Sequence, residues 1–220
     1  MDIVSAVPIS DARTSVLDQL TTLRVIPVVV LERVADAAPL GRALVAGGLP
    51  CAEVTFRTPA AAAAIAELAA DSAMLVGAGT VVRADQVDEA LAAGASFVVS
   101  PGFSPSVVRR CQELGVPVLP GVATPTELMM ALDAGLTVVK FFPAETNGGV
   151  PALKALSAPF GGVRFVPTGG VSVGNLSSYL SVPSVLAVGG SWMVAPALVA
   201  AGDFDEISRL TAEAVALVTA

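Results

Sequence analysis

The chain has 220 residues, of which 54% are hydrophobic and 14% charged, and its formal net charge at pH 7 is −7. An acidic chain with scattered arginines lacks the clustered basic surface that binds a phosphate backbone, so we expect no nucleic-acid partner. It has no histidine, the commonest general base and metal ligand. Cys51 and Cys111 are far apart in sequence, which indicates buried thiols in a reducing compartment and neither a metal site nor a disulfide framework.

The N-terminal segment has no basic stretch followed by an apolar run, so it does not resemble a secretory signal. We therefore expect a cytoplasmic protein. From Ser10-Asp11, a plausible helix cap, as far as Leu23, apolar residues recur at helical spacing. This pattern predicts a short N-terminal helix ahead of the first strand.

A strand-like apolar run followed by a helical pattern then occurs eight times along the chain. Continuous apolar strands that alternate with helices indicate a parallel sheet covered by helices. The expected strands are 24–30, 50–56, 74–77, 96–100, 116–119, 136–142, 163–167 and 184–188.

Eight such units are the number that closes a (β/α)8 barrel, and a single barrel commonly has about 200–250 residues. We therefore predict an α/β fold in which residues 1–220 form one (β/α)8 TIM barrel domain with a short N-terminal helix. An open doubly wound sheet is the alternative, because closure cannot be read from a sequence.

The stretch from Phe165 to Gly202 carries no charge and is long enough to suggest a membrane span. Three prolines and two glycine pairs divide it into segments too short to cross a bilayer. We interpret it as buried strand, loop and helix, and we expect no membrane partner.

Lys140 lies in an apolar run from Val138 to Phe142 that is closed by Pro143. Such a run predicts a buried strand, where an ammonium group is costly. Burial favours the neutral amine, which can attack a carbonyl and form a Schiff base. The alternative is a lysine that reaches the strand end or pairs with a carboxylate.

The second expected strand carries Glu53, Thr55 and Arg57 on one face, because strand side chains alternate. Glu53 could move protons, and Arg57 could hold a planar carboxylate by two parallel hydrogen bonds. A buried Glu53–Arg57 pair without chemistry is the structural alternative.

Other expected strand ends are rich in glycine. Thr80 follows Gly77-Ala78-Gly79, where capping of a helix is a simpler role than ligand binding. The last two strands end in Thr168-Gly169-Gly170 and Gly189-Gly190-Ser191, and paired glycines before a helix offer backbone N–H groups to an anion. Barrels often bind phosphate with the loops after strands seven and eight. A buried lysine, a carboxylate, an arginine and an anion-binding backbone together predict Schiff-base chemistry on a small phosphorylated oxo acid.

These strand-end motifs resemble those of the bacterial 2-keto-3-deoxy-6-phosphogluconate (KDPG) aldolase and 4-hydroxy-2-oxoglutarate aldolase family. The resemblance extends, in order, from Arg24 to Asp203. Its motifs are Glu53-Val54-Thr55-Phe56-Arg57-Thr58, Gly77-Ala78-Gly79-Thr80-Val81, Ser100-Pro101-Gly102, Pro120-Gly121-Val122-Ala123-Thr124-Pro125, Lys140-Phe141-Phe142-Pro143-Ala144-Glu145, Pro167-Thr168-Gly169-Gly170-Val171 and Gly189-Gly190-Ser191-Trp192.

The resemblance implies a homotrimeric class I aldolase of the Entner–Doudoroff pathway, a lyase that needs no cofactor or metal. Such an enzyme reversibly cleaves KDPG to pyruvate and D-glyceraldehyde 3-phosphate. Lys140 would form the Schiff base, and Glu53 would move protons through the carbinolamine, imine and enamine. The implied substrate-binding residues are Arg57, Thr80, Pro101, Phe142 and Thr168, and the implied phosphate-binding residues are Gly169, Gly170, Gly190 and Ser191.

Other functions remain open. The same lysine chemistry could act on 4-hydroxy-2-oxoglutarate or on the phosphogalactonate isomer of KDPG. A metal-dependent barrel aldolase or a phosphosugar isomerase would need a carboxylate cluster, and Glu53 and Glu145 are the obvious carboxylates near expected strand ends. A barrel that binds a phosphosugar without catalysis would need neither Lys140 nor Glu53.

Overall fold

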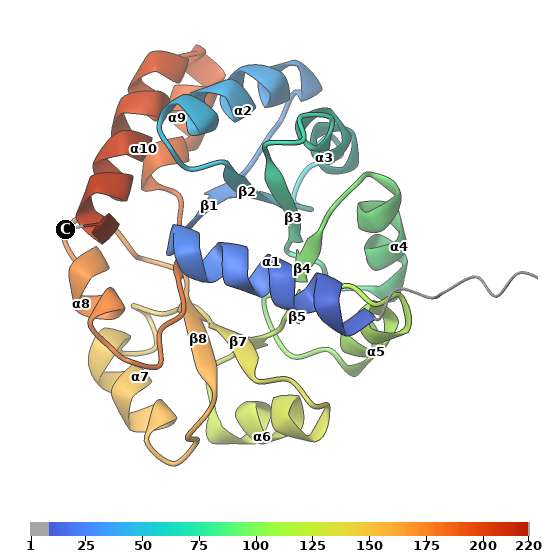
Figure 1. The fold of residues 1–220 in the computed structure, drawn as a ribbon, viewed down its shortest axis with the longest axis vertical. Coiled ribbons are helices and arrows are strands. Elements are labelled where there is room, and N and C mark those ends of the chain that lie inside the picture. Colours follow the sequence, from blue (N-terminus) through green and yellow to red (C-terminus); the bar gives the residue numbers. More distant parts are fainter. Residues whose placement is uncertain (1–8, 220) are drawn as a thin grey trace, which may run out of the picture.

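The computed structural model describes residues 9–219. The expectations for residues 1–8, and the last residue of the predicted domain, lie outside this range. Strands alternate with helices, and the paired strands are parallel to their neighbours. In Figure 1 the helices surround the strands, and α1 lies across them. The chain therefore has the predicted α/β architecture with parallel, curled sheets.

The elements follow the predicted order. The strands are β1 (Val25–Val29), β2 (Cys51–Thr55), β3 (Leu75–Gly79), β4 (Phe97–Val99), β5 (Val118–Leu119), β6 (Gly121–Val122), β7 (Val138–Phe141), β8 (Arg164–Pro167) and β9 (Val188–Gly190). The α-helices are α1 (Ile9–Leu23), α2 (Ala37–Ala46), α3 (Ala61–Ala69), α4 (Ala84–Ala92), α5 (Pro105–Glu113), α6 (Pro125–Asp133), α7 (Gly149–Ser157), α8 (Leu176–Leu180), α9 (Pro196–Ala201) and α10 (Phe204–Thr219). Two 3-10 helices are η1 (Val34–Asp36) and η2 (Trp192–Val194). None of these helices is both long and apolar enough to cross a membrane.

The strands pair in two sheets, a six-stranded one in the order β5-β4-β3-β2-β1-β9 and a three-stranded one in the order β6-β7-β8. Pro120 separates β5 from β6, because proline has no N–H to donate to a sheet. Its carbonyl nevertheless accepts a hydrogen bond from the N–H of Lys140 at 2.9 Å. Beside β8, isolated parallel bridges join Phe165 to Val185 and Thr168 to Gly189. The continuous sheet thus stays open after six strands.

Apolar side chains pack on both sides of the strands. The larger cluster lies between strands and helices, and a second cluster lies on the inner side of the strands. Leu20 of α1 and Phe97 of β4 belong to the inner cluster, and both are fully buried. A Cβ at Gly77 would fall 2.6 Å from Cδ2 of Phe97, so glycine makes room for this ring. Helix α1 therefore covers the amino ends of the strands with apolar contacts.

The eighth strand differs from the prediction. The sequence predicts a strand at 184–188, whereas β9 runs from Val188 to Gly190 and pairs with β1. A Cβ at Gly189 would fall 2.9 Å from Cγ2 of Thr168, and one at Gly190 would fall 2.9 Å from Cη2 of Trp192. The prediction was wrong because glycine is generally depleted in strands. Here the strand contains glycine because the side chains of Thr168 and Trp192 approach its backbone too closely to leave room for a Cβ.

Candidate active site

Strand β7 turns Lys140 toward the interior. Val139 and Phe141 belong to the outer cluster, so the alternation of strand side chains places Lys140 on the opposite side. Its Nζ lies 3.1 Å from Oε1 of Glu53, and the two side chains are 6% and 2% exposed. Because β2 and β7 belong to different sheets, this contact spans the interior. An amine beside a carboxylate in a buried interior can form a Schiff base with adjacent proton transfer.

Glu53 therefore pairs with Lys140 and not with Arg57, the pairing that the sequence allowed. Thr55 is buried on the same strand, where its Oγ1 donates to the carbonyl of Val29 at 2.9 Å. Arg57 lies beyond the end of β2 and is exposed. Its guanidinium makes no hydrogen bond or ion pair with the described residues, so it remains free to bind an anion.

The end of β3 borders Glu53. A Cβ at Gly79 would fall 2.7 Å from Cγ of Glu53, so glycine leaves the space that this side chain occupies. Thr80 follows with a φ of 56°, which is unusual for a β-branched residue and costs about 1–3 kcal/mol. It caps no helix, because α4 begins at Ala84 after Arg83. Strained residues of this kind cluster at active sites, so the strain favours the ligand-binding role.

Phe142 and Thr168 lie close to Lys140. The ring centroid of Phe142 is 5.1 Å from Nζ of Lys140. Thr168 directly follows β8, whose Val166 is paired with Lys140, and only 5% of Thr168 is exposed. The structure therefore brings both predicted residues to the strand end that carries the lysine.

Pro101 approaches the same lysine from another strand. Gly121 is the neighbour of Lys140 in the sheet. A Cβ at Gly121 would overlap the carbonyl of Pro101 and fall 2.7 Å from the nitrogen of Gly102. The loop at 101–102 therefore packs directly on the strand beside Lys140.

Two glycine-rich segments occupy the ends of β8 and β9. The N–H groups of Gly170, Val171 and Ser191 donate to no acceptor within residues 9–219. Unpaired N–H groups of this kind suit an anion. After β8 the expected helix does not follow directly, because α8 begins at Leu176 and has five residues, whereas after β9 the short 3-10 helix η2 begins directly after Ser191. Gly190 itself is the last residue of β9. The prediction of an anion site therefore depends on the unpaired backbone N–H groups and not on the N-terminus of a long helix.

Sequence reasoning missed one contact at these loops. The hydroxyl of Tyr179 donates to Oε1 of Glu145. Tyr179 is the single tyrosine of the chain, which is the one signal that could have identified it. The contact joins the loop after β7 to the helix after β8.

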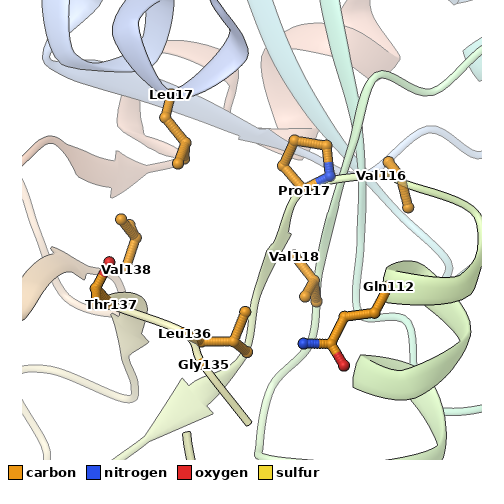
Figure 2. A pocket seen from close by; sticks show the side chains of 9 residues that line it. All are labelled: Leu17, Gln112, Val116, Pro117, Val118, Gly135, Leu136, Thr137 and Val138. Atoms are coloured by element: carbon orange, nitrogen blue, oxygen red, sulfur yellow. The ribbon is translucent and has the colours of Figure 1, made fainter. Parts of the chain in front are cut away.

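Neither a metal-binding cluster nor the cavity in Figure 2 adds to this site. Within the described residues, no three His, Cys, Asp or Glu side chains gather where they could hold a metal ion. A cavity of about 140 Å³ lies at the opposite ends of the strands, where Figure 2 shows Leu17 of α1 across from Val138, the first residue of β7, and Pro117. No predicted site residue lines it.

Comparison with known proteins gives consistent matches. The sequence matches the family model for KDPG and KHG aldolase over residues 16–210. It is 53% identical to the 2-dehydro-3-deoxy-phosphogluconate aldolase of Treponema pallidum, over 93% of this chain and 98% of that protein.

Solved structures match as well. The KDPG aldolase of Zymomonas mobilis with 3-phosphoglycerate has a TM-score of 0.86 and 45% identity, over 91% of this chain and 95% of that one. The KDPG aldolase of Legionella pneumophila, with pyruvate captured as a covalent carbinolamine intermediate, has a TM-score of 0.87 and 40% identity, over 90% and 97%.

Proposed function

Because the chain belongs to the KDPG and KHG aldolase family, we propose that it is a class I aldolase, a lyase that cleaves KDPG to pyruvate and D-glyceraldehyde 3-phosphate. The observation that carries the proposal is the buried contact of 3.1 Å between Nζ of Lys140 and Oε1 of Glu53. The covalent carbinolamine in the Legionella relative supports lysine chemistry on pyruvate. In this role the chain acts in the Entner–Doudoroff pathway.

The first half of the reaction forms the Schiff base. The neutral amine of Lys140 attacks the C2 carbonyl carbon of the substrate, and the carbonyl oxygen takes up a proton to give a carbinolamine. Loss of water then leaves a protonated imine. Glu53 touches the same amine, so its carboxylate is placed to accept and return these protons.

The second half breaks the carbon–carbon bond. Glu53 accepts the proton of the C4 hydroxyl, the C3–C4 bond breaks, and its electron pair moves toward the imine to give an enamine. The aldehyde then leaves. The acid form of Glu53 returns a proton to C3, and water releases pyruvate and the free amine.

Charged and polar groups at the strand ends would hold the substrate. Arg57 is exposed and unpaired within the described chain, so it can grip the pyruvate carboxylate by two hydrogen bonds. Thr80 would join it, and the contacts of Pro101, Phe142 and Thr168 around Lys140 support roles as pocket walls.

The phosphate would lie at the ends of β8 and β9. We assign it to Gly169, Gly170, Gly190 and Ser191, and the unpaired N–H groups of Gly170, Val171 and Ser191 support this assignment. The Zymomonas relative that was solved with 3-phosphoglycerate also supports a phosphorylated ligand.

A second candidate function is cleavage of 4-hydroxy-2-oxoglutarate, because the matching family includes KHG aldolase. This substrate has a second carboxylate in place of the phosphate, so its cleavage would use Lys140 and Glu53 with no phosphate at the glycine-rich loops. The phosphogalactonate isomer of KDPG would use all of them. Comparison of kcat/KM for the three oxo acids separates these substrates.

We also propose that the two sheets form one closed (β/α)8 barrel and that residues 1–220 are one domain. The hydrogen bond from Lys140 to the carbonyl of Pro120 supports the interpretation of β5 and β6 as one interrupted strand. The bridges of Phe165 with Val185 and of Thr168 with Gly189 support closure beside β8.

For the assembly, we propose a homotrimer located in the cytoplasm. Met129, Met130 and Leu132 of α6 are 57%, 39% and 38% exposed, and apolar side chains at a surface favour an interface between subunits. Light scattering should give a mass three times that of the 22.0 kDa chain. A monomeric mass would contradict the trimer.

Reductive trapping tests the chemistry. Sodium borohydride reduces an imine with pyruvate to a stable secondary amine, which peptide mass spectrometry can locate. We expect an adduct on Lys140 and none in Lys140→Ala. Lys154, which is exposed and the only other lysine, is the internal control.

The outcomes separate the candidate functions. An adduct on Lys154 alone, or no adduct, would rule out the lysine mechanism. A protein that binds phosphosugars but traps no pyruvate would be the non-catalytic barrel.

A further inference from the structure

Glu145 and Tyr179 connect the loop after β7 to helix α8, which follows β8. The Tyr179 hydroxyl donates to Oε1 of Glu145, and the tyrosine is fully buried. Burial raises the pKa of the Tyr179 phenol, and the hydrogen bond to Glu145 raises it further. The phenol therefore stays protonated and continues to donate at neutral pH.

Two glycines make room for this contact. A Cβ at Gly170, where φ is +82°, would fall 2.7 Å from Cβ of Glu145. A Cβ at Gly149, where φ is +61°, would fall 3.1 Å from Oε1 of Glu145 and 3.5 Å from the Tyr179 hydroxyl. Any larger residue at Gly170 would push Glu145 away, so the side chain of Glu145 packs directly on the glycine-rich loop after β8.

Hydrogen bonds hold the same loop from two sides. The N–H of Glu145 donates to the carbonyl of Gly169 at 3.0 Å, and the N–H of Ala144 donates to that of Thr168 at 2.8 Å. On the other side, Nδ2 of Asn175 donates to the carbonyl of Gly170 at 3.0 Å. The carbonyls of Gly169 and Gly170 share planar peptide units with the N–H groups of Gly170 and Val171. Because these hydrogen bonds fix the carbonyls, they also fix the orientation of the two unpaired N–H groups.

We propose that Glu145 and Tyr179 are positioning residues that hold the N–H groups of Gly170 and Val171 in place for the phosphate monoester of the substrate. The proposal rests on the proposed function, because that function supplies the phosphorylated substrate. Neither side chain needs to touch the phosphate. Their contact should therefore affect phosphate binding and leave the chemistry at Lys140 unchanged.

Tyr179→Phe tests this proposal, because it removes one hydroxyl and keeps the buried ring. We expect the Kd for inorganic phosphate, and the KM for KDPG, to rise about tenfold. The backbone N–H groups that lose their orientation donate to a charged phosphate, and the loss of one such hydrogen bond changes a binding constant by about that factor. The kcat, and the rate of borohydride trapping of pyruvate, should stay within about twofold of the unchanged protein.

Thr211→Val is the matched control. Thr211 is also fully buried, and its hydroxyl donates to the carbonyl of Ile207 at 2.7 Å within α10. This variant should lose a similar amount of stability and bind phosphate as the unchanged protein does. A shift in Kd that appears in both variants would show a general loss of stability and overturn the proposal.

The remaining outcomes are also decisive. Unchanged phosphate binding in Tyr179→Phe, or a parallel loss of pyruvate trapping, would overturn the positioning role, and so would an unchanged protein that binds no phosphate. If the unchanged protein binds phosphate, and Tyr179→Phe weakens that binding, but neither traps pyruvate, the positioning role stands and the proposed aldolase function fails.

Discussion

Gly79→Ala should slow the enzyme about 100-fold without changing a catalytic residue. The added Cβ would lie 2.7 Å from Cγ and 2.9 Å from Cδ of Glu53. Carbon atoms in contact are normally about 3.5–4.0 Å apart, so the Glu53 side chain must move by about 1 Å. This movement disrupts its hydrogen bond of 3.1 Å with Lys140. A displacement of about 1 Å costs about 100-fold in rate, or about 2.7 kcal/mol of transition-state stabilisation.

The assay is kcat/KM for the cleavage of KDPG, measured as pyruvate release. Gly161→Ala is the matched control, because a Cβ at Gly161 has nothing within 4 Å, and its rate should not change. Urea denaturation of Gly79→Ala should show a loss of about 1–3 kcal/mol from overpacking, which leaves a folded protein. A folded Gly79→Ala with kcat/KM within threefold of the control would refute the argument that Glu53 must hold its present position.

Two further substitutions test the strand ends. Arg57→Ala should raise the pyruvate concentration needed for half-maximal borohydride trapping by about 10- to 100-fold, because it removes hydrogen bonds to a charged group; an unchanged concentration dependence would contradict the carboxylate role. Thr80→Gly should raise the free energy of unfolding in urea by about 1 kcal/mol, because glycine adopts the φ of 56° without strain, while kcat/KM falls. A less stable Thr80→Gly would show that the backbone there stores no strain.

The strand that carries Lys140 was predictable from local sequence. A run of β-branched and aromatic residues indicates a buried strand, and the alternation of side chains decides which side each residue faces. The partner of Lys140 was not predictable in this way. Glu53 is 87 residues away, and the two meet only because the sheets curl toward each other. Arg57 is closer to Glu53 in sequence, but the strand ends at Thr55 and Arg57 is exposed in the turn that follows.

The glycine-rich strand ends show a second limit of sequence reasoning. Gly169-Gly170 lie in a loop after β8, as their motif predicts. The assignment of Gly189-Gly190 to a loop failed because their neighbours, Thr168 and Trp192, come close only in the folded chain. The contact of Tyr179 with Glu145 was missed for the same reason. Family resemblance supplied candidate residues, whereas long-range packing decided which of them touch.

The inner apolar cluster fills the interior at the amino ends of the strands. Leu20 of α1 and the Phe97 ring are fully buried there, so we expect a molecule to approach the amine of Lys140 from the carboxyl ends of the strands. During cleavage the pyruvate carbons stay attached to this amine, while the aldehyde fragment lies nearer the opening. The two products must therefore leave one after the other, with the aldehyde first, because the pyruvate carbons are released only when water hydrolyses the imine.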